Sequence, residues 1–171
     1  LIYEDYMINI KDKSRCCGCE ACRQVCPRQC ITMEEDPEGY AYPQVDAQRC
    51  INCGMCETVC PFTATEEATD APGAFAVKNT NDNERMDSSS GGLFIALAKS
   101  VIDGGGVVFG AVFDKEWGVA HTHSETVDGA RAMMGSKYVQ SRIGDTYQQA
   151  EYFLKAGRKV MFTGTPCQIA G

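Results

Sequence analysis

The sequence predicts an α+β cysteine-rich module followed by the first part of an α/β domain with a mixed sheet. One observation behind this prediction is a cysteine pattern, C-x2-C-x2-C-x3-C-P, that occurs at residues 16–27 and again at residues 50–61. The other is a change, near residue 87, to alternating apolar stretches of helix and strand type. We therefore expect one domain at 7–66, a linker at 67–87 and a second domain at 88–171.

The two copies of the cysteine pattern align without gaps, because they start at residues 16 and 50 and every cysteine falls on its counterpart. Two nearby cysteines stand outside this alignment. Cys17 falls on Ile51 and Cys30 falls on Ala64, so each occupies a position where the other copy has an apolar residue. A cysteine that is not a ligand often behaves as a small buried hydrophobe, and we expect this role for both.

The spacing of the aligned cysteines predicts two 4Fe-4S clusters. Three cysteines wrap one cubane, and the fourth, which precedes proline, ligates the other cluster. The predicted ligands are Cys16, Cys19, Cys22 and Cys60 for cluster one, and Cys50, Cys53, Cys56 and Cys26 for cluster two. Paired C-x2-C motifs also bind zinc. A zinc site uses cysteines in two pairs, so it needs neither a third cysteine at the same spacing nor a cysteine that precedes proline. Structural zinc is therefore the less favoured alternative.

Because they contain this cysteine pattern twice, residues 7–66 resemble the two-cluster bacterial ferredoxin fold. The segments 30–34 and 40–43 are expected to form short strands around a turn at 36–39. Such a module has little apolar core. The resemblance therefore implies that the clusters hold the module together and that removing iron unfolds it.

The acidic composition bears on the partners of the chain. Its formal net charge is −7, and two oxidised clusters with their thiolates would add about four negative charges. The sequence has no stripe of Lys and Arg, so we expect no nucleic-acid partner. A basic patch on a redox partner protein would complement the negative charge.

The cysteine content also bears on the compartment. The chain has eleven cysteines, and its first residues lack the basic start and apolar core of a secretory signal. We therefore expect cluster thiols in a reducing cytoplasm. The longest apolar stretches, at 93–98 and 107–113, are too short to span a bilayer. Because Leu1 is not an initiator and Gly171 stops the chain as a helix begins, we also expect a fragment of a longer protein.

The second domain alternates helices and strands after a polar, turn-rich linker. A helix is predicted at 93–102, with Leu93, Leu97 and Val101 facing the core. Ser90 is expected to cap this helix and Gly104 to end it. The other expected elements are strands at 107–113 and 117–123, a weaker helix at 127–134, a strand at 137–140, a helix at 145–156 and a strand at 159–162.

Two stretches of this domain could carry chemistry. Residues 88–92, Ser-Ser-Ser-Gly-Gly, offer hydroxyls and backbone N–H groups to an anion at a helix N-terminus. The alternative is a helix cap with glycines for close packing. Residues 163–167 end a strand in a tight turn, where α/β sheets present ligands, and Cys167 there could be buried, reactive or a metal ligand. His121 and His123 lie two residues apart on an expected strand and face one way, but no third ligand is nearby. We expect them to be packing or surface residues, with metal binding as the remote alternative.

The segments 88–92, 135–141 and 163–171 resemble the start of the coenzyme F(420) hydrogenase/dehydrogenase beta-subunit family. The resemblance implies a flavoprotein that joins iron–sulfur clusters to a flavin, usually FAD, and then to a small diffusible substrate. It also implies roles for individual residues. Ser90, Gly91 and Gly92 would approach the flavin phosphate, and Lys137 would lie near the flavin or the substrate. Cys167 would help to hold a further cluster or would line the redox site.

We therefore expect the N-terminal part of an iron–sulfur flavoprotein oxidoreductase, or of a subunit of one. Electrons would pass between a redox partner, the two clusters and a flavin that exchanges hydride with a substrate. The full-length protein would be the enzyme, whereas this fragment alone would only transfer electrons. The alternative is a non-enzymatic, ferredoxin-type carrier or wiring subunit. The sequence identifies no catalytic residue.

Overall fold

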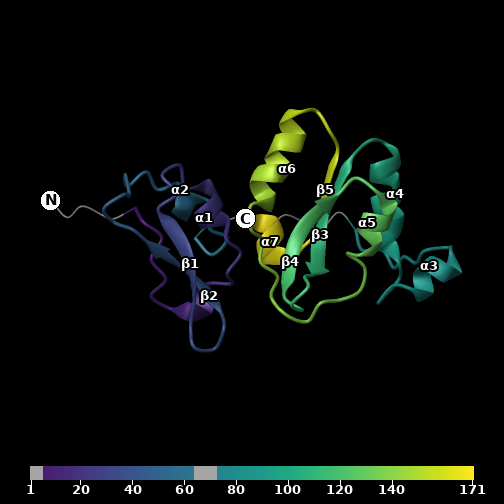
Figure 1. The fold of residues 1–171 in the computed structure, drawn as a ribbon, viewed down its shortest axis with the longest axis horizontal. Helices are drawn as coiled ribbons and strands as arrows, with labels where there is room; N and C mark the ends of the chain where they lie inside the picture. The colour runs from purple at the N-terminus through teal and green to yellow at the C-terminus, as the bar shows by residue number, and fades with distance from the viewer. Residues whose placement is uncertain (1–5, 64–72) are drawn as a thin grey trace. The chain divides into compact units, whose positions relative to one another are not determined.

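The computed structural model describes residues 6–63 and 73–171, and these fall into two compact units (Figure 1). The first unit contains the cysteine module and the C-terminal residues Thr165–Gly171. The described part of the second unit runs from residue 73 to residue 164. Part of the expected linker, up to residue 72, lies outside the described residues.

The first unit is built from short elements. The module contains the 3-10 helix η1 (Lys13–Arg15), the helices α1 (Ala21–Val25) and α2 (Met55–Thr58), and the strands β1 (Ile31–Glu35) and β2 (Ala41–Val45). The two strands pair antiparallel, from Ile31 opposite Val45 to Glu35 opposite Ala41, so both predicted strands are confirmed with a shift of one or two residues. Asp36 closes their turn, because its carboxylate accepts from the backbone N–H groups of Glu38 and Tyr40.

The C-terminal helix of this unit, α7 (Pro166–Ala170), begins with a capping box. Thr165 is the N-cap residue, and its backbone N–H donates to Gln168 Oε1 over 2.9 Å. Pro166 occupies the first helical position, where its missing N–H costs no hydrogen bond. The helix that the sequence suggests near its end is therefore present.

The hydrophobic core of the first unit is small and rich in sulfur. Its buried residues are Ile8, Cys22, Cys30, Ile31 and Cys56. The expected burial of Cys30 is confirmed, whereas the other cysteine expected to be buried, Cys17, remains partly exposed. A core with so few aliphatic side chains stabilises a fold weakly without further cross-links.

The second unit contains a three-stranded mixed sheet of order β4-β3-β5. Its strands are β3 (Val107–Phe113), β4 (Val119–Ser124) and β5 (Val160–Phe162). The central strand β3 pairs antiparallel with β4 and parallel with β5, which confirms the predicted mixed sheet. The first four residues of the apolar run of β3, 107–110, are buried on both faces, as expected of a central strand, whereas Phe113 at its end is exposed.

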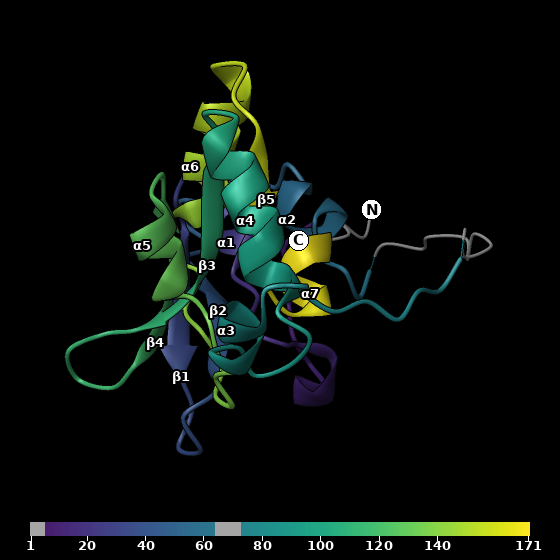
Figure 2. The same ribbon diagram turned by 90° about the vertical axis from the view of Figure 1, so that its right-hand side faces the viewer.

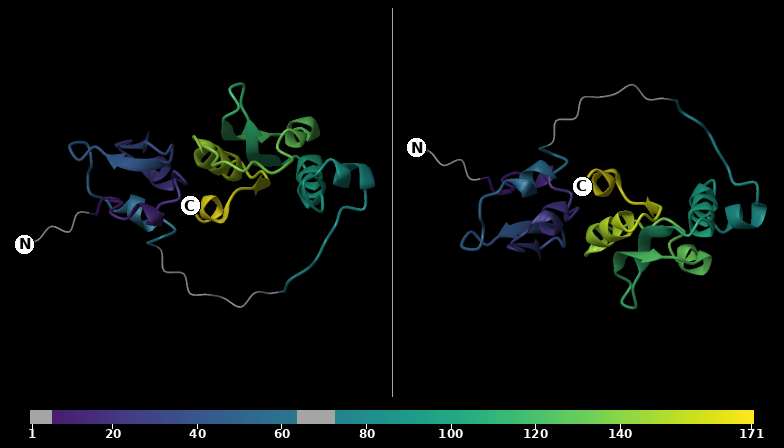
Figure 3. Two further views of the ribbon diagram at one scale, coloured as in Figure 1. Left: turned by 90° about the horizontal axis from the view of Figure 1, so that it is seen from below. Right: turned by 90° about the horizontal axis from the view of Figure 1, so that it is seen from above.

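Helices cover both faces of this sheet (Figures 2 and 3). Helices α4 (Leu93–Asp103) and α5 (Val127–Arg131) pack on one face through a core that includes Val108. Helix α6 (Thr146–Lys155) packs on the other face through a core that includes Val107 and Phe109. Successive residues of β3 point to opposite faces, so one strand supplies both cores.

The predicted core face of α4 is wrong at Leu93 and Leu97, whereas the third predicted residue, Val101, is partly buried and packs against the core. The residues that α4 buries completely are Ile95 and Ala98, whereas Leu93 is 44% exposed and Leu97 is 48% exposed. Residues spaced by four drift around a helix, while spacings of three and four keep to one face. The predicted cap is also wrong, because the N-cap residue is Gly92, in a left-handed conformation, and no side chain caps the helix.

Two further expectations require correction. The strand expected at 137–140 is absent, and the nearest strand-like contact is an isolated bridge between Ala120 and Arg142. The expected linker contains a short helix, α3 (Asp82–Met86), whose N-cap Asn81 accepts from the backbone N–H groups of Asn83 and Glu84. The turn between β3 and β4 holds Trp117, which is exposed and has a left-handed backbone with φ 64°.

Candidate metal centre and cofactor pocket

The cysteines of the first unit line two cavities. The first cavity is lined by the cysteines Cys16, Cys17, Cys19, Cys22 and Cys60. The second is lined by the cysteines Cys26, Cys30, Cys50, Cys53 and Cys56. The fourth cysteine of each sequence copy therefore lies with the first three cysteines of the other copy, which is the arrangement that crossed ligation requires.

Each cysteine loop has a left-handed backbone conformation at the same two positions. Gly18 and Glu20 have φ 62° in the first copy, and their counterparts Asn52 and Gly54 have φ 54° and 75° in the second. Gly and Asn adopt this conformation readily, whereas Glu20 does so at an energetic cost. The repeated conformation shows that both copies fold into the same loop despite their different residues.

Backbone N–H groups point at the cysteine sulfurs in these loops. The N–H of Asn52 donates to Cys50 Sγ, and the N–H of Ile8 donates to Cys56 Sγ, both over 3.3 Å. Such bonds stabilise thiolate sulfur, so the residues present fit iron–sulfur clusters. No three His, Cys, Asp or Glu side chains in residues 6–63 and 73–171 are grouped to hold one metal ion. In a cubane, by contrast, each thiolate binds a different iron atom.

Burial sets the protonation of the thiols before clusters bind. It raises the pKa of Cys16 and of Cys19, and it is the largest of the causes that raise the pKa of Cys22 to about 12. Burial also raises the pKa of Cys56 in the second cavity. These thiols are therefore protonated at neutral pH, and cluster binding must release their protons.

Of the cysteines outside the predicted ligand sets, Cys17 and Cys30 line the cavities and Cys167 lies beside the first one. Cys30 Sγ is 3.4 Å from Cys26 Sγ, and burial is the main cause that raises the pKa of Cys30 to about 11. Cys167 lies against the first cavity, where its thiol interacts with the Cys17 thiol. Burial, followed by this interaction, raises the pKa of Cys17. Thr165 Oγ1 is 3.0 Å from Cys167 Sγ.

The second unit holds a pocket of about 430 Å³, within the range of small-molecule sites. It is lined by residues 88–92, which we call the serine-glycine loop, together with Ser136 and apolar side chains. The apolar lining residues are Phe75, Val77, Leu93, Phe94, Met133 and Met134. The pocket therefore combines an apolar wall with a polar rim of hydroxyls.

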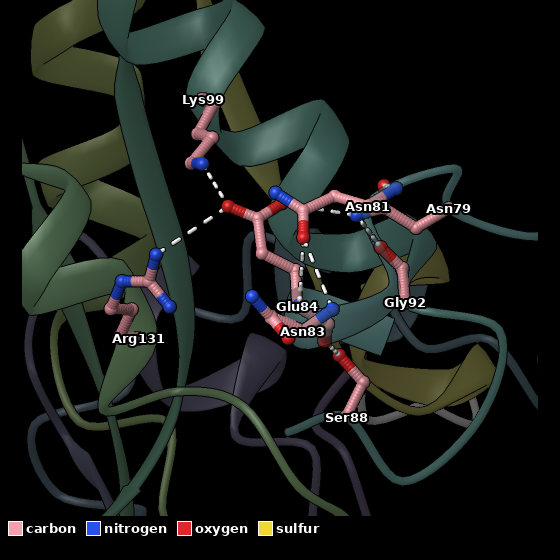
Figure 4. A network of polar contacts seen from close by, with 8 residues as sticks. All are labelled: Asn79, Asn81, Asn83, Glu84, Ser88, Gly92, Lys99 and Arg131. Atoms are coloured by element: carbon pink, nitrogen blue, oxygen red, sulfur yellow. Dashed lines mark hydrogen bonds and ion pairs between the residues drawn. The ribbon is translucent and has the colours of Figure 1, made fainter. Parts of the chain in front are cut away.

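A polar network centred on Asn79 and Glu84, which do not line the pocket, holds the serine-glycine loop in place (Figure 4). The backbone N–H of Asn79 donates to Gly91 O over 2.7 Å. Its side-chain Nδ2 donates to Gly92 O over 3.3 Å and to Glu84 Oε2 over 3.1 Å. Ser88 Oγ donates to the backbone oxygen of Glu84 over 2.7 Å. Both ends of the loop are thus tied to α3 and to the segment before it.

The Glu84 carboxylate at the centre of this network is buried and carries two ion pairs. It accepts from Lys99 Nζ, and Arg131 lies 3.4 Å away (Figure 4). The hydrogen bond from Lys99, followed by that from Asn79, lowers the pKa of Glu84. The carboxylate is therefore ionised at neutral pH and joins α3 to α4 and α5.

The glycines of the loop have a packing role, which was the alternative left open by the sequence. A Cβ on Gly91 would lie 2.7 Å from Val77 O. Gly92 has φ 72°, and a Cβ there would lie 3.0 Å from Asn79 Cβ. Both glycines therefore allow the polypeptide to approach itself closely, while the loop still lines the pocket through its other face.

Lys137 and the histidines lie outside the pocket lining. Lys137 Nζ donates to the backbone oxygens of Met133 and Met134 over 2.9 and 2.8 Å, and burial lowers its pKa. It therefore supports the turn that carries part of the pocket wall. His121 Nε2 lies 2.8 Å from Thr163 O, and His123 Nδ1 lies 3.1 Å from Gln149 Oε1, so both rings have structural partners.

Sequence reasoning missed Asn79 and Glu84 as the support of the loop. A signal for α3 was present, because Asn81 and Glu84 have the spacing of a helix N-cap and its third residue. The ion pairs with Lys99 and Arg131 join residues far apart in the chain and have no local sequence pattern.

Comparison with known proteins assigns part of the chain. Residues 15–64 match the family model of the 4Fe-4S dicluster domain. No curated protein matches the chain. Within the described residues, no helix is long and apolar enough to cross a membrane. The matched segment contains both cysteine loops and all the cysteines that line the two cavities. Residues 15–64 are therefore a 4Fe-4S dicluster domain, an electron-transfer domain that acts with a redox partner.

Proposed function

We propose that this chain is part of an iron–sulfur flavoprotein oxidoreductase. It would pass electrons between a redox partner protein, two 4Fe-4S clusters and a flavin that reduces or oxidises a small diffusible substrate. The observation that carries the proposal is the pocket of about 430 Å³ beside the serine-glycine loop, in the same chain as a dicluster domain. The resemblance of residues 88–92, 135–141 and 163–171 to the coenzyme F(420) hydrogenase/dehydrogenase beta-subunit family supports it.

For the clusters we propose the crossed ligand sets. Cys16, Cys19, Cys22 and Cys60 would bind cluster one, and Cys50, Cys53, Cys56 and Cys26 would bind cluster two. The lining of the two cavities supports these sets. Cys167 has less support as a ligand of a further cluster, because its described neighbours are cysteines that already line the first cavity. We propose instead that it is a thiol beside cluster one.

For the flavin we propose FAD, which would supply the conversion between one-electron and two-electron transfer when bound. Ser90 and the backbone of the serine-glycine loop would bind its phosphates, and the apolar wall would contact its ring. No side chain caps α4. The backbone N–H groups of its first turn would therefore donate to the phosphate oxygens. Lys137 would act by supporting Met133 and Met134 in the pocket wall.

The test is to purify the full-length protein anaerobically and to assay iron, sulfide and acid-released flavin. The proposal predicts about eight irons per chain together with a stoichiometric flavin. Iron without flavin would contradict the flavoprotein and leave the non-enzymatic electron carrier. A colourless protein with zinc as its main metal would contradict the clusters as well.

A further inference from the structure

We infer that Asn79, together with Glu84, positions the serine-glycine loop for binding the phosphate of a cofactor. The inference rests on the proposed function, because it concerns the same pocket. Neither residue lines that pocket. Both are therefore positioning residues, which act through the loop and do not contact the ligand.

Asn79 controls the orientation of two consecutive peptide groups. Its backbone N–H binds Gly91 O, and its side-chain amide binds Gly92 O. A trans peptide points its N–H away from its C=O. With both carbonyls directed at Asn79, the N–H groups of Gly92 and Leu93 must point away from Asn79. Gly92 and Leu93 line the pocket, so this orientation favours an acceptor oxygen there.

The Asn79 side chain is itself held in place from both ends. Its Oδ1 accepts from the backbone N–H of Asn81 over 2.9 Å, and its Nδ2 is shared between Gly92 O and the Glu84 carboxylate. The amide therefore cannot rotate without losing a bond at each end. Such an arrangement fixes the loop before a ligand arrives, which reduces the ordering that binding requires.

The charges beneath the loop are compatible with an anion in the pocket. Glu84 contributes one negative charge, whereas Lys99 and Arg131 contribute two positive charges (Figure 4). The network as a whole is therefore cationic. Glu84 can orient Asn79 without making the loop repel phosphate, because its own charge is more than balanced.

The experiment compares two flavins on the full-length protein that retains its clusters and has been freed of bound flavin by dialysis. FAD carries phosphates, whereas riboflavin has the same ring system without them. We expect Asn79→Ala to weaken FAD binding about tenfold, since the side-chain hydrogen bond to Gly92 O is lost together with the side-chain bonds to Glu84 and Asn81. Riboflavin binding should change less than about twofold, because the apolar wall of the pocket is unaltered. Both dissociation constants are read from flavin fluorescence.

Two further variants separate geometry from charge. Asn79→Asp keeps the acceptor for Asn81 but places an oxygen against Gly92 O and Glu84, so FAD should again bind more weakly. Asn83→Asp adds the same charge four residues away, on an exposed side chain in the first turn of α3, where a negative charge is tolerated. This matched control should bind FAD like the unaltered protein.

Each outcome decides between the alternatives. Equal losses for FAD and riboflavin, with a lower melting temperature, would show a merely structural role and overturn the inference. Unchanged FAD binding in both Asn79 variants would overturn it too, while leaving the proposed function intact. If the unaltered protein binds neither flavin, the proposed function fails and the inference fails with it. An effect of Asn83→Asp as large as that of Asn79→Asp would assign the loss to charge and overturn the inference.

Discussion

At the scale of single residues, the chain uses cysteine in two different ways. Eight cysteines repeat at equivalent positions of two loops, whereas Cys17, Cys30 and Cys167 have no equivalent cysteine. Their thiols nevertheless lie against those of cysteines in the repeat or against each other. Proximity alone therefore does not distinguish a ligand from a neighbour, and substitution is needed.

We expect Cys30→Ala and Cys17→Ser to retain about eight irons per chain, because neither belongs to the repeated pattern. Cys60→Ser should instead impair the same cluster as Cys22→Ser, and Cys26→Ser should impair the other. Iron analysis and electron paramagnetic resonance of the reduced proteins measure both effects. Loss of half the iron in Cys30→Ala would contradict the proposed ligand sets.

The Glu84 carboxylate should make the stability of the second unit depend on pH. Its pKa is depressed by Lys99 and Asn79, so its contribution is complete above the unfolded value, about 4.3, and is lost as pH falls through the folded value. Glu84→Gln should therefore be less stable than the unaltered protein at pH 7, and the difference should shrink below about pH 4.

Urea unfolding followed by circular dichroism measures this difference at each pH. Glu116→Gln is the matched control, since Glu116 is exposed and its side chain has no ion pair among those that the structure describes. A Glu84→Gln deficit that is constant between pH 7 and pH 3 would contradict a role for the ionised carboxylate.

At the scale of elements, α4 shows which face of a helix the sheet selects. Ile95 and Ala98 are completely buried against β3, and the small Ala98 side chain allows close packing. Leu97 is almost half exposed on the same helix. The apolar composition of this helix does not reveal its buried face, because both faces contain large aliphatic residues.

Truncation of α4 side chains tests the observed register. Ile95→Ala should lower the free energy of unfolding by about 3 kcal/mol, because it leaves a cavity in the core. Leu97→Ala should lower it by less than about 1 kcal/mol, since much of that side chain already contacts water. Urea unfolding of both variants provides the comparison. Similar losses of unfolding free energy in the two variants would indicate that Leu97 faces the core, as the sequence predicts.

The serine-glycine loop should tolerate no side chain at its first glycine. Gly91→Ala places a Cβ against Val77 O and should destabilise the second unit by about 1–3 kcal/mol. Gly104→Ala is the matched control, because a Cβ there would make only ordinary contacts at 3.5 Å and φ is −83°. Thermal unfolding distinguishes them, and equal melting temperatures would contradict the close approach.

These elements also show how far the sequence could predict the fold. The strand 107–113 was predictable because a continuous apolar run matches a strand buried on both faces. The strand expected at 137–140 failed because Tyr138 and Val139 are exposed, at 94% and 62%, and find no partner strand. The spacing of the cysteines alone indicated which of them would lie together. The support of the serine-glycine loop was not predictable in this way, because Lys99 and Arg131 reach Glu84 from distant positions.

At the scale of the whole molecule, the two units differ in what holds them together. The first has a core of few aliphatic side chains, whereas the second has two cores on a covered sheet. A unit whose folding is coupled to metal unfolds when the metal is removed. The second unit has its own hydrophobic cores and should not depend on iron.

Removal of iron with a chelator should therefore unfold one unit and spare the other. Hydrogen exchange measured by mass spectrometry should become fast in β1 and β2 and remain slow in β3. The holo protein under the same conditions is the control. Loss of protection in β3 to the same extent would show that the units unfold together.

The exposed turn between β3 and β4 has a practical consequence for such measurements. Trp117 is the single tryptophan of the chain, and it lies in the second unit with its ring 5.9 Å from Phe113. Because this ring is already exposed, unfolding should change its emission intensity, through loss of the Phe113 contact, more than its emission maximum. That intensity can report on the second unit, while the visible absorption of bound clusters reports on the first. One sample followed at two wavelengths would reveal the order in which the two units lose their structure.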